Sequence, residues 1–140
     1  MKPWVTYAIL SMLFAGFTSV VAKMGLAGIT GEVGLTVRTV FVAVLVIVFA
    51  VFAVSPGQLS ALTRDNFVWL GVSGLTTTLS WIFYYKALKD GEVSTIAVID
   101  KASMVVAVLL AFFILKEKIT PRTMAGGALM IAGLLVIARK

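Results

Sequence analysis

The sequence contains no cysteine, no histidine and few charged residues. The absence of cysteine excludes disulfides, thiol nucleophiles and thiolate-bound iron–sulfur clusters. The absence of histidine excludes the common zinc sites as well. No nucleophile–base pair or metal constellation can be assembled from the residues that remain. The sequence therefore argues against an enzyme, and we expect neither a metal nor a cofactor.

Apolar residues, by contrast, make up 61% of the 140 positions, against about 45–50% in a typical soluble domain. The charged residues fall mostly between long apolar runs. This pattern predicts an integral membrane protein that contacts membrane lipids. The net charge of +6 then gives no indication of nucleic-acid binding, because the basic residues cluster at the expected membrane boundaries.

Five apolar runs are candidate membrane spans, since about 20 apolar residues in a helix cross the roughly 30 Å hydrocarbon core of a bilayer. We predict a single all-α membrane domain over residues 1–140, with one helix for each run. The predicted helices cover approximately residues 4–26, 34–54, 66–88, 94–115 and 121–138. The first run is longer than the apolar part of a signal peptide, so we interpret it as a retained helix.

Turn and cap residues set several of these boundaries. The segment Ser55–Gly57 contains the proline and glycine that end the second helix. Ser94 or Thr95 is expected to cap the fourth helix. Thr120 followed by Pro121 has the pattern of an N-cap with proline at the first helical position of the last helix.

Lysine and arginine divide almost evenly between the two sides of the predicted bundle, whose odd number of spans puts the termini on opposite sides. The N-terminal side holds Lys2, Arg64, Lys116, Lys118 and Arg122. The other side holds Lys23, Lys86, Lys89, Arg139 and Lys140, with Arg38 and Lys101 slightly deeper in the membrane. The excess of positive charge that normally fixes orientation is therefore nearly absent. Either a weak signal still fixes the orientation, or the chain inserts both ways and pairs with an inverted copy of itself.

Asp100 and Lys101 stand side by side inside the fourth apolar run. A charge within the membrane costs on the order of 3 kcal/mol by insertion scales, so such residues need partners, water or a ligand. Adjacent helical residues project about 100° apart, so we expect these two not to pair with each other. Asp100 should instead meet Lys23 or Arg38 from another helix, in a buried ion pair or in a solute or proton site.

Several further polar residues fall at a similar depth. Arg38 lies early in the second run, and Lys23 ends the first run. For Lys23 and for Lys86 we favour snorkelling, in which the side chain extends toward the headgroups. Trp81 is expected to line a solute pocket, because Tyr84 and Tyr85 already supply the aromatic belt at the membrane interface. Together with Ser19, the candidate substrate or coupling residues are Asp100, Lys101, Lys23, Arg38, Trp81 and Tyr84.

Small residues mark two helix faces. Ser19 belongs to a small, polar stripe of the first run that either lines a pathway or lets another helix approach closely. The last run has small residues at helical spacing and no internal charge, as expected for a packing or dimerisation helix. These residues are Ala125, Gly126, Ala128, Ala132 and Gly133.

Four features resemble one known family. They are the segment FAGFTSVVAKMGL, Arg38, the long run WIFYYKALKDGEVSTIAVIDKASMVVAVLLAFFILKEKIT, and the glycine-rich GGALMIAGLLVIA. They resemble the EamA domain of the drug/metabolite transporter superfamily, and more closely its stand-alone five-helix bacterial members. Many relatives have a Ser-Pro pair near Asp100 that breaks the fourth helix. This sequence has no proline there, so the resemblance does not imply a kinked helix for this chain.

The resemblance implies a fold and a function. Most members of the superfamily have ten helices in two halves of inverted topology, so this chain resembles one half and would need a mate, most simply in an antiparallel homodimer. Members export small metabolites, amino acids or drugs across the prokaryotic cytoplasmic membrane, commonly by proton coupling or exchange. We therefore expect an alternating-access exporter. The alternatives are an accessory subunit of a heteromeric membrane protein and a flippase for a lipid-linked carrier.

Overall fold

A computed structural model describes residues 3–138, so the predictions for Lys2, Arg139 and Lys140 lie outside the described residues. Over that range the chain forms helices and turns without strands. Four stretches have the length and composition to cross a membrane: Pro3–Gly25, Gly31–Ala53, Arg64–Asp90 and Val93–Ile114. A shorter apolar helix covers Pro121–Ile137. The prediction of an all-α membrane protein with five apolar helical stretches is confirmed.

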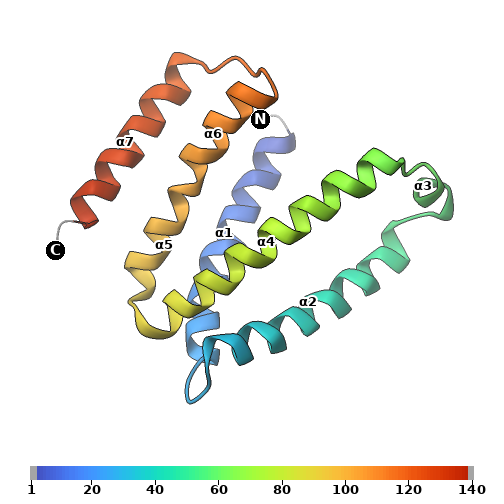
Figure 1. The fold of residues 1–140 in the computed structure, drawn as a ribbon, viewed down its shortest axis with the longest axis horizontal. Helices are drawn as coiled ribbons and strands as arrows, with labels where there is room; N and C mark the ends of the chain where they lie inside the picture. Colours follow the sequence, from blue (N-terminus) through green and yellow to red (C-terminus); the bar gives the residue numbers. More distant parts are fainter. Residues whose placement is uncertain (1–2, 139–140) are drawn as a thin grey trace. The chain divides into compact units, whose positions relative to one another are not determined.

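The chain divides into two compact units (Figure 1). The central unit consists of residues 20–90, and the terminal unit consists of residues 1–19 together with residues 91–140. Helix α1, Pro3–Gly25, contributes its first part to the terminal unit and its last turns to the central unit.

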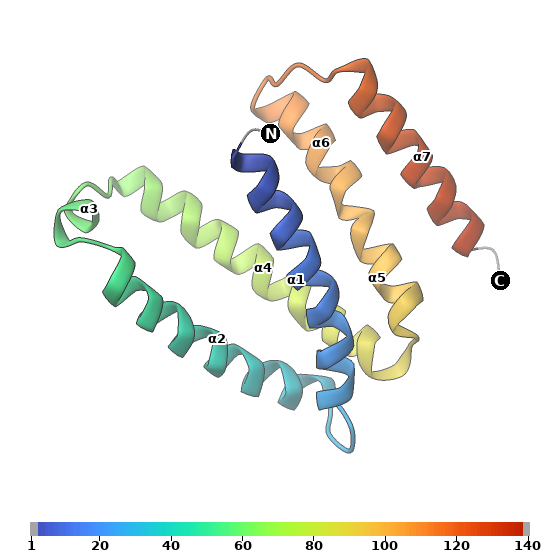
Figure 2. The same ribbon diagram turned by 180° about the vertical axis from the view of Figure 1, so that it is seen from behind.

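In the central unit, α2 (Gly31–Ala53) and α4 (Arg64–Asp90) run antiparallel, as both ribbon views show (Figures 1 and 2). Helix α2 begins three residues before the predicted start because Thr30 caps it, with the Val33 N–H donating to Thr30 Oγ1 at 3.4 Å. The connection to α4 contains a five-residue helix, α3 (Pro56–Ser60). The side chain of Gln58 accepts a hydrogen bond from the Ser55 N–H at 2.8 Å, which stabilises the start of α3.

The core of the central unit lies where α1 ends, α2 begins and α4 ends. Leu26, Tyr85 and Leu88 are the buried apolar side chains of the described residues, with exposed fractions of 2%, 4% and 0%. Gly31 is buried beside them, and a Cβ atom at this position would lie 2.8 Å from the carbonyl oxygen of Tyr85. The close approach of α2 to α4 therefore requires glycine at position 31.

In the terminal unit, the fourth apolar run forms two helices rather than one. Helix α5 (Val93–Lys101) ends just before Ala102, and α6 (Ser103–Ile114) begins just after it. Around Ala102 the hydrogen bonds tighten to three-residue spacing: its N–H donates to the Ile99 carbonyl, and its own carbonyl accepts from the Val105 N–H. The helix is thus interrupted next to Asp100 and Lys101 without the proline that breaks it in many relatives.

The two helix caps predicted for this unit had different outcomes. Helix α7 (Pro121–Ala138) starts at the predicted proline, and the Thr123 N–H donates to Thr120 Oγ1 at 3.2 Å, so that cap is confirmed. The prediction that Ser94 or Thr95 caps the fourth span was wrong. The cap is Glu92, whose carbonyl accepts from the Ile96 N–H, and this bond places both hydroxyl residues inside the first turn.

We expect Gly31→Ala to lower the stability of the protein by about 1–3 kcal/mol, because the added methyl group forces the backbones of α2 and α4 apart. The matched control is Gly71→Ala, since a Cβ atom at Gly71 has no other atom within 4 Å. Thermal unfolding of both purified variants in detergent measures the effect. Equal midpoints for the two variants would contradict the close approach at Gly31.

Candidate functional site

The sequence-predicted site residues divide between the two units. The central unit contains Lys23, Arg38, Trp81 and Tyr84, and the terminal unit contains Ser19, Asp100, Lys101 and the small residues of α7. The contacts within each unit show what these side chains do.

Arg38 is packed against aromatic rings. Its guanidinium carbon lies 4.4 Å from the centroid of the Trp81 ring and 5.8 Å from that of the Tyr85 ring. Trp81 and Tyr85 are four residues apart on α4, so they share one face of the helix. A guanidinium over an aromatic face gains electrostatic attraction without a carboxylate. The positive charge of Arg38 is therefore held between α2 and α4.

Tyr85 was not among the predicted site residues, although its spacing from Trp81 was a usable signal. Tyr84, which was predicted, meets the Tyr85 ring edge to face, with the ring centroids 6.3 Å apart. Such aromatic pairs add to packing beyond the area they bury. The arginine and the three aromatic side chains form one continuous cluster in the central unit.

Lys23 and Lys89 bind each other's helix ends. Lys23 Nζ donates to the carbonyl oxygens of Leu88 at 2.6 Å and of Lys89 at 2.9 Å. Lys89 Nζ donates to the carbonyl oxygen of Leu26 at 3.1 Å. The last carbonyls of a helix have no partner within the helix and carry partial negative charge, so each lysine satisfies the end of the other helix. We refer to these three bonds as the lysine clasp.

The lysine clasp corrects the snorkelling interpretation of Lys23. A snorkelling lysine extends toward the headgroups and keeps its ammonium group in water. Lys23 instead reaches across to α4, 65 residues away in the sequence. Backbone carbonyls at a membrane boundary compete effectively with water for such an ammonium group, since they need donors.

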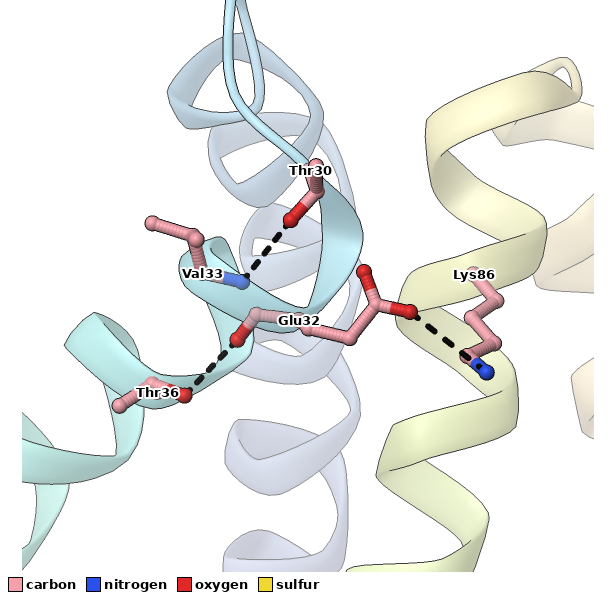
Figure 3. A network of polar contacts seen from close by, with 5 residues as sticks. All are labelled: Thr30, Glu32, Val33, Thr36 and Lys86. Atoms are coloured by element: carbon pink, nitrogen blue, oxygen red, sulfur yellow. Dashed lines mark hydrogen bonds and ion pairs between the residues drawn. The ribbon is translucent and has the colours of Figure 1, made fainter.

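Lys86 also has a partner that sequence reasoning missed. Its Nζ atom lies 3.5 Å from Glu32 Oε1, and the two side chains are 56% and 61% exposed. Figure 3 shows Glu32 extending from the first turn of α2 toward Lys86 on α4. Exposed ion pairs of this kind contribute little to stability. Glu32 lies in the first turn of α2, where the helix dipole favours an acidic residue.

A groove with a volume of about 560 Å³ runs between α2 and α4. Glu32 and Lys86 belong to its lining, and the remaining lining residues are Leu35, Thr36, Thr39, Val40, Ala43, Thr78 and Ile82. The α2 residues of this lining extend from the start of the helix to its middle. Because α2 and α4 are antiparallel, Glu32 and Lys86 both lie at the same end of the groove.

Asp100 pairs with Lys101 in the terminal unit, which corrects the expectation that these neighbours do not interact. Lys101 Nζ lies 3.3 Å from Asp100 Oδ2, and the side chains are 58% and 36% exposed. The long side chain of lysine allows this pairing, because its four-carbon stem can fold back along the helix toward the preceding residue.

The remaining predicted residues are Ser19 and the small residues of α7. Ser19 Oγ donates to the Ala15 carbonyl at 3.3 Å, a bond within its own helix. The small residues of α7 (Ala125, Gly126, Ala128, Ala132 and Gly133) are all exposed. A Cβ atom added at Gly126 or Gly133 would have no other atom within 4 Å. The packing role of this α7 face stays a prediction.

Two comparisons relate the chain to known proteins. Residues 2–139 match the model of the EamA-like transporter family. The chain is also 35% identical over 140 residues to a Sinorhizobium protein named "Uncharacterized transporter in cobO 3'region", an alignment that covers 98% of this chain and 97% of that protein. No solved structure matches the chain significantly.

We expect Lys23→Met to lower stability by about 1–3 kcal/mol, because the Leu88 and Lys89 carbonyls at the end of α4 lose a charged donor. The matched control is Lys118→Met, which removes the same charge from an exposed residue between α6 and α7. Thermal unfolding in detergent compares the two variants. If Lys118→Met is as destabilising as Lys23→Met, the lysine clasp does not hold the helix ends.

Proposed function

The chain belongs to the EamA-like transporter family, and on this premise we propose that it exports small metabolites or drugs as an antiparallel homodimer. The family match over residues 2–139 is the observation that carries the proposal. The chain is a multi-pass membrane protein, and we place it in the cytoplasmic membrane of a prokaryote.

The odd number of helices supports pairing with an inverted copy. When a unit with an odd number of spans is duplicated, the second copy inserts upside down, which is how many transporters build inverted repeats. A chain of five apolar helices can reach the same arrangement with two separate molecules. The nearly even division of lysine and arginine between the two sides allows both orientations.

Two inverted copies suggest a mechanism of alternating access. In each copy, Arg38, Trp81 and the lysine clasp lie toward one end of the central unit, so the mate carries the same groups toward the opposite membrane surface. Exchange of two equivalent conformations then exposes a site between the copies to each side in turn. Arg38 attracts anionic groups, and Trp81 and Tyr84 provide apolar walls for a solute.

Asp100 is the proposed coupling group. It lies beside Ala102, where the hydrogen-bond spacing of the fourth span tightens. In transporters, irregular helices near the midplane commonly form the substrate and ion sites. Lys101 pairs with the carboxylate of Asp100 and therefore competes with a proton for it. Protonation of Asp100 would release Lys101 and change the charge of the site, which links proton movement to solute movement.

We expect Asp100→Asn to abolish transport driven by a pH gradient, because the amide cannot take up a proton. Purified protein in liposomes is tested with a panel of amino acids, nucleosides and apolar drugs, and proton flux is followed with an enclosed pH-sensitive dye. Asp65→Asn is the control, since Asp65 is an exposed acid at the start of α4. Wild-type flux in a well-assembled Asp100→Asn variant would refute the coupling role.

A further inference from the structure

We propose that the groove between α2 and α4 binds one membrane phospholipid with a zwitterionic headgroup. Its ammonium group contacts Glu32, its phosphate contacts Lys86, and one acyl chain lies along the groove. This site goes beyond the proposed transport function, because the groove lies within the central unit and needs no second copy to be complete.

The walls of the groove are suited to an acyl chain. Its three threonines turn their hydroxyl groups to their own backbones: Thr36 Oγ1 donates to the Glu32 carbonyl at 2.8 Å, Thr39 Oγ1 to the Leu35 carbonyl at 2.8 Å, and Thr78 Oγ1 to the Gly74 carbonyl at 2.9 Å. Figure 3 shows the first of these bonds. With their hydroxyl protons engaged, the threonines add little polarity to the apolar lining. A polar solute would find few partners there.

The charged end of the groove is balanced. Glu32 and Lys86 carry opposite charges 3.5 Å apart. The neighbouring cations are engaged elsewhere, because Arg38 lies over Trp81 and Lys89 donates to the Leu26 carbonyl. An anionic lipid would be repelled by Glu32, and a cationic amphiphile would be repelled by Lys86. A headgroup with both an ammonium group and a phosphate satisfies both residues.

The length of the groove matches one leaflet. The lining residues of α2 extend from Glu32 to Ala43, which is about 16 Å at a rise of 1.5 Å per residue. Half of the hydrocarbon core of a bilayer is about 15 Å. A lipid with its headgroup at Glu32 and Lys86 would therefore extend its acyl chain to the midplane. A small soluble zwitterion would occupy only the charged end.

Native mass spectrometry of the full-length protein tests the headgroup. The protein is released from micelles that contain equal amounts of phosphatidylethanolamine and phosphatidylglycerol with identical acyl chains. We expect wild type to retain the ethanolamine lipid about tenfold more than the glycerol lipid, which corresponds to one tenfold step in the dissociation constant. Glu32→Gln should reverse this preference, since Lys86 is left without its acidic neighbour. The control Asp65→Asn should retain the wild-type preference.

A second pair of variants tests the acyl chain. Ala43→Trp fills the groove and should remove the retention of both lipids, whereas Val44→Trp changes an exposed neighbour outside the groove and should not. Equal retention of the two lipids by wild type, or an unchanged preference in Glu32→Gln, would overturn the proposal. So would a loss of dimer without a loss of lipid in Ala43→Trp, since the groove would then hold a second copy. If Ala43→Trp does not fold, the reversal in Glu32→Gln decides alone.

Discussion

The lysine clasp is the interaction on which the central unit depends. Helix ends near a membrane boundary leave carbonyl groups that need donors, and Lys23 and Lys89 supply them across the ends of α1 and α4. The clasp binds the carbonyls of Leu88 and Leu26, two residues whose side chains are buried. The end of α4 also meets the start of α2, where Gly31 permits close backbone contact. Lys23, for which snorkelling to the headgroups was predicted, is therefore structural.

Arg38 and Lys86, two other cations of the central unit, have partners of other kinds. The guanidinium of Arg38 lies over Trp81, and an apolar groove lies between α2 and α4 with Glu32 and Lys86 at one end. Together with the lysines of the clasp, these cations thus have three kinds of partner: backbone carbonyls, aromatic rings and a carboxylate.

The membrane spans could be predicted from the sequence, but the contacts between polar side chains could not. Long apolar runs and the Thr120–Pro121 pair located helices well, because hydropathy and caps act over a few neighbouring residues. The clasp joins residues more than 60 positions apart, so no local pattern indicated it. The Asp100–Lys101 pair was missed for the opposite reason. The angle between neighbouring helical residues was applied without the reach of the lysine stem, which brings Lys101 Nζ to 3.3 Å from Asp100 Oδ2. The tighter hydrogen-bond spacing at Ala102 likewise has no local marker such as proline.

The central claim is that the chain works as an inverted pair, and its lack of cysteine gives a direct test. Single cysteines at Ala27, between α1 and α2, and at Ser60, in α3, lie at opposite ends of α2. Intact cells that carry either variant are labelled with a membrane-impermeant thiol reagent. The account predicts that both cysteines label in comparable fractions, because the chain inserts in both orientations. Labelling of only one position would show a fixed orientation and would contradict the antiparallel homodimer.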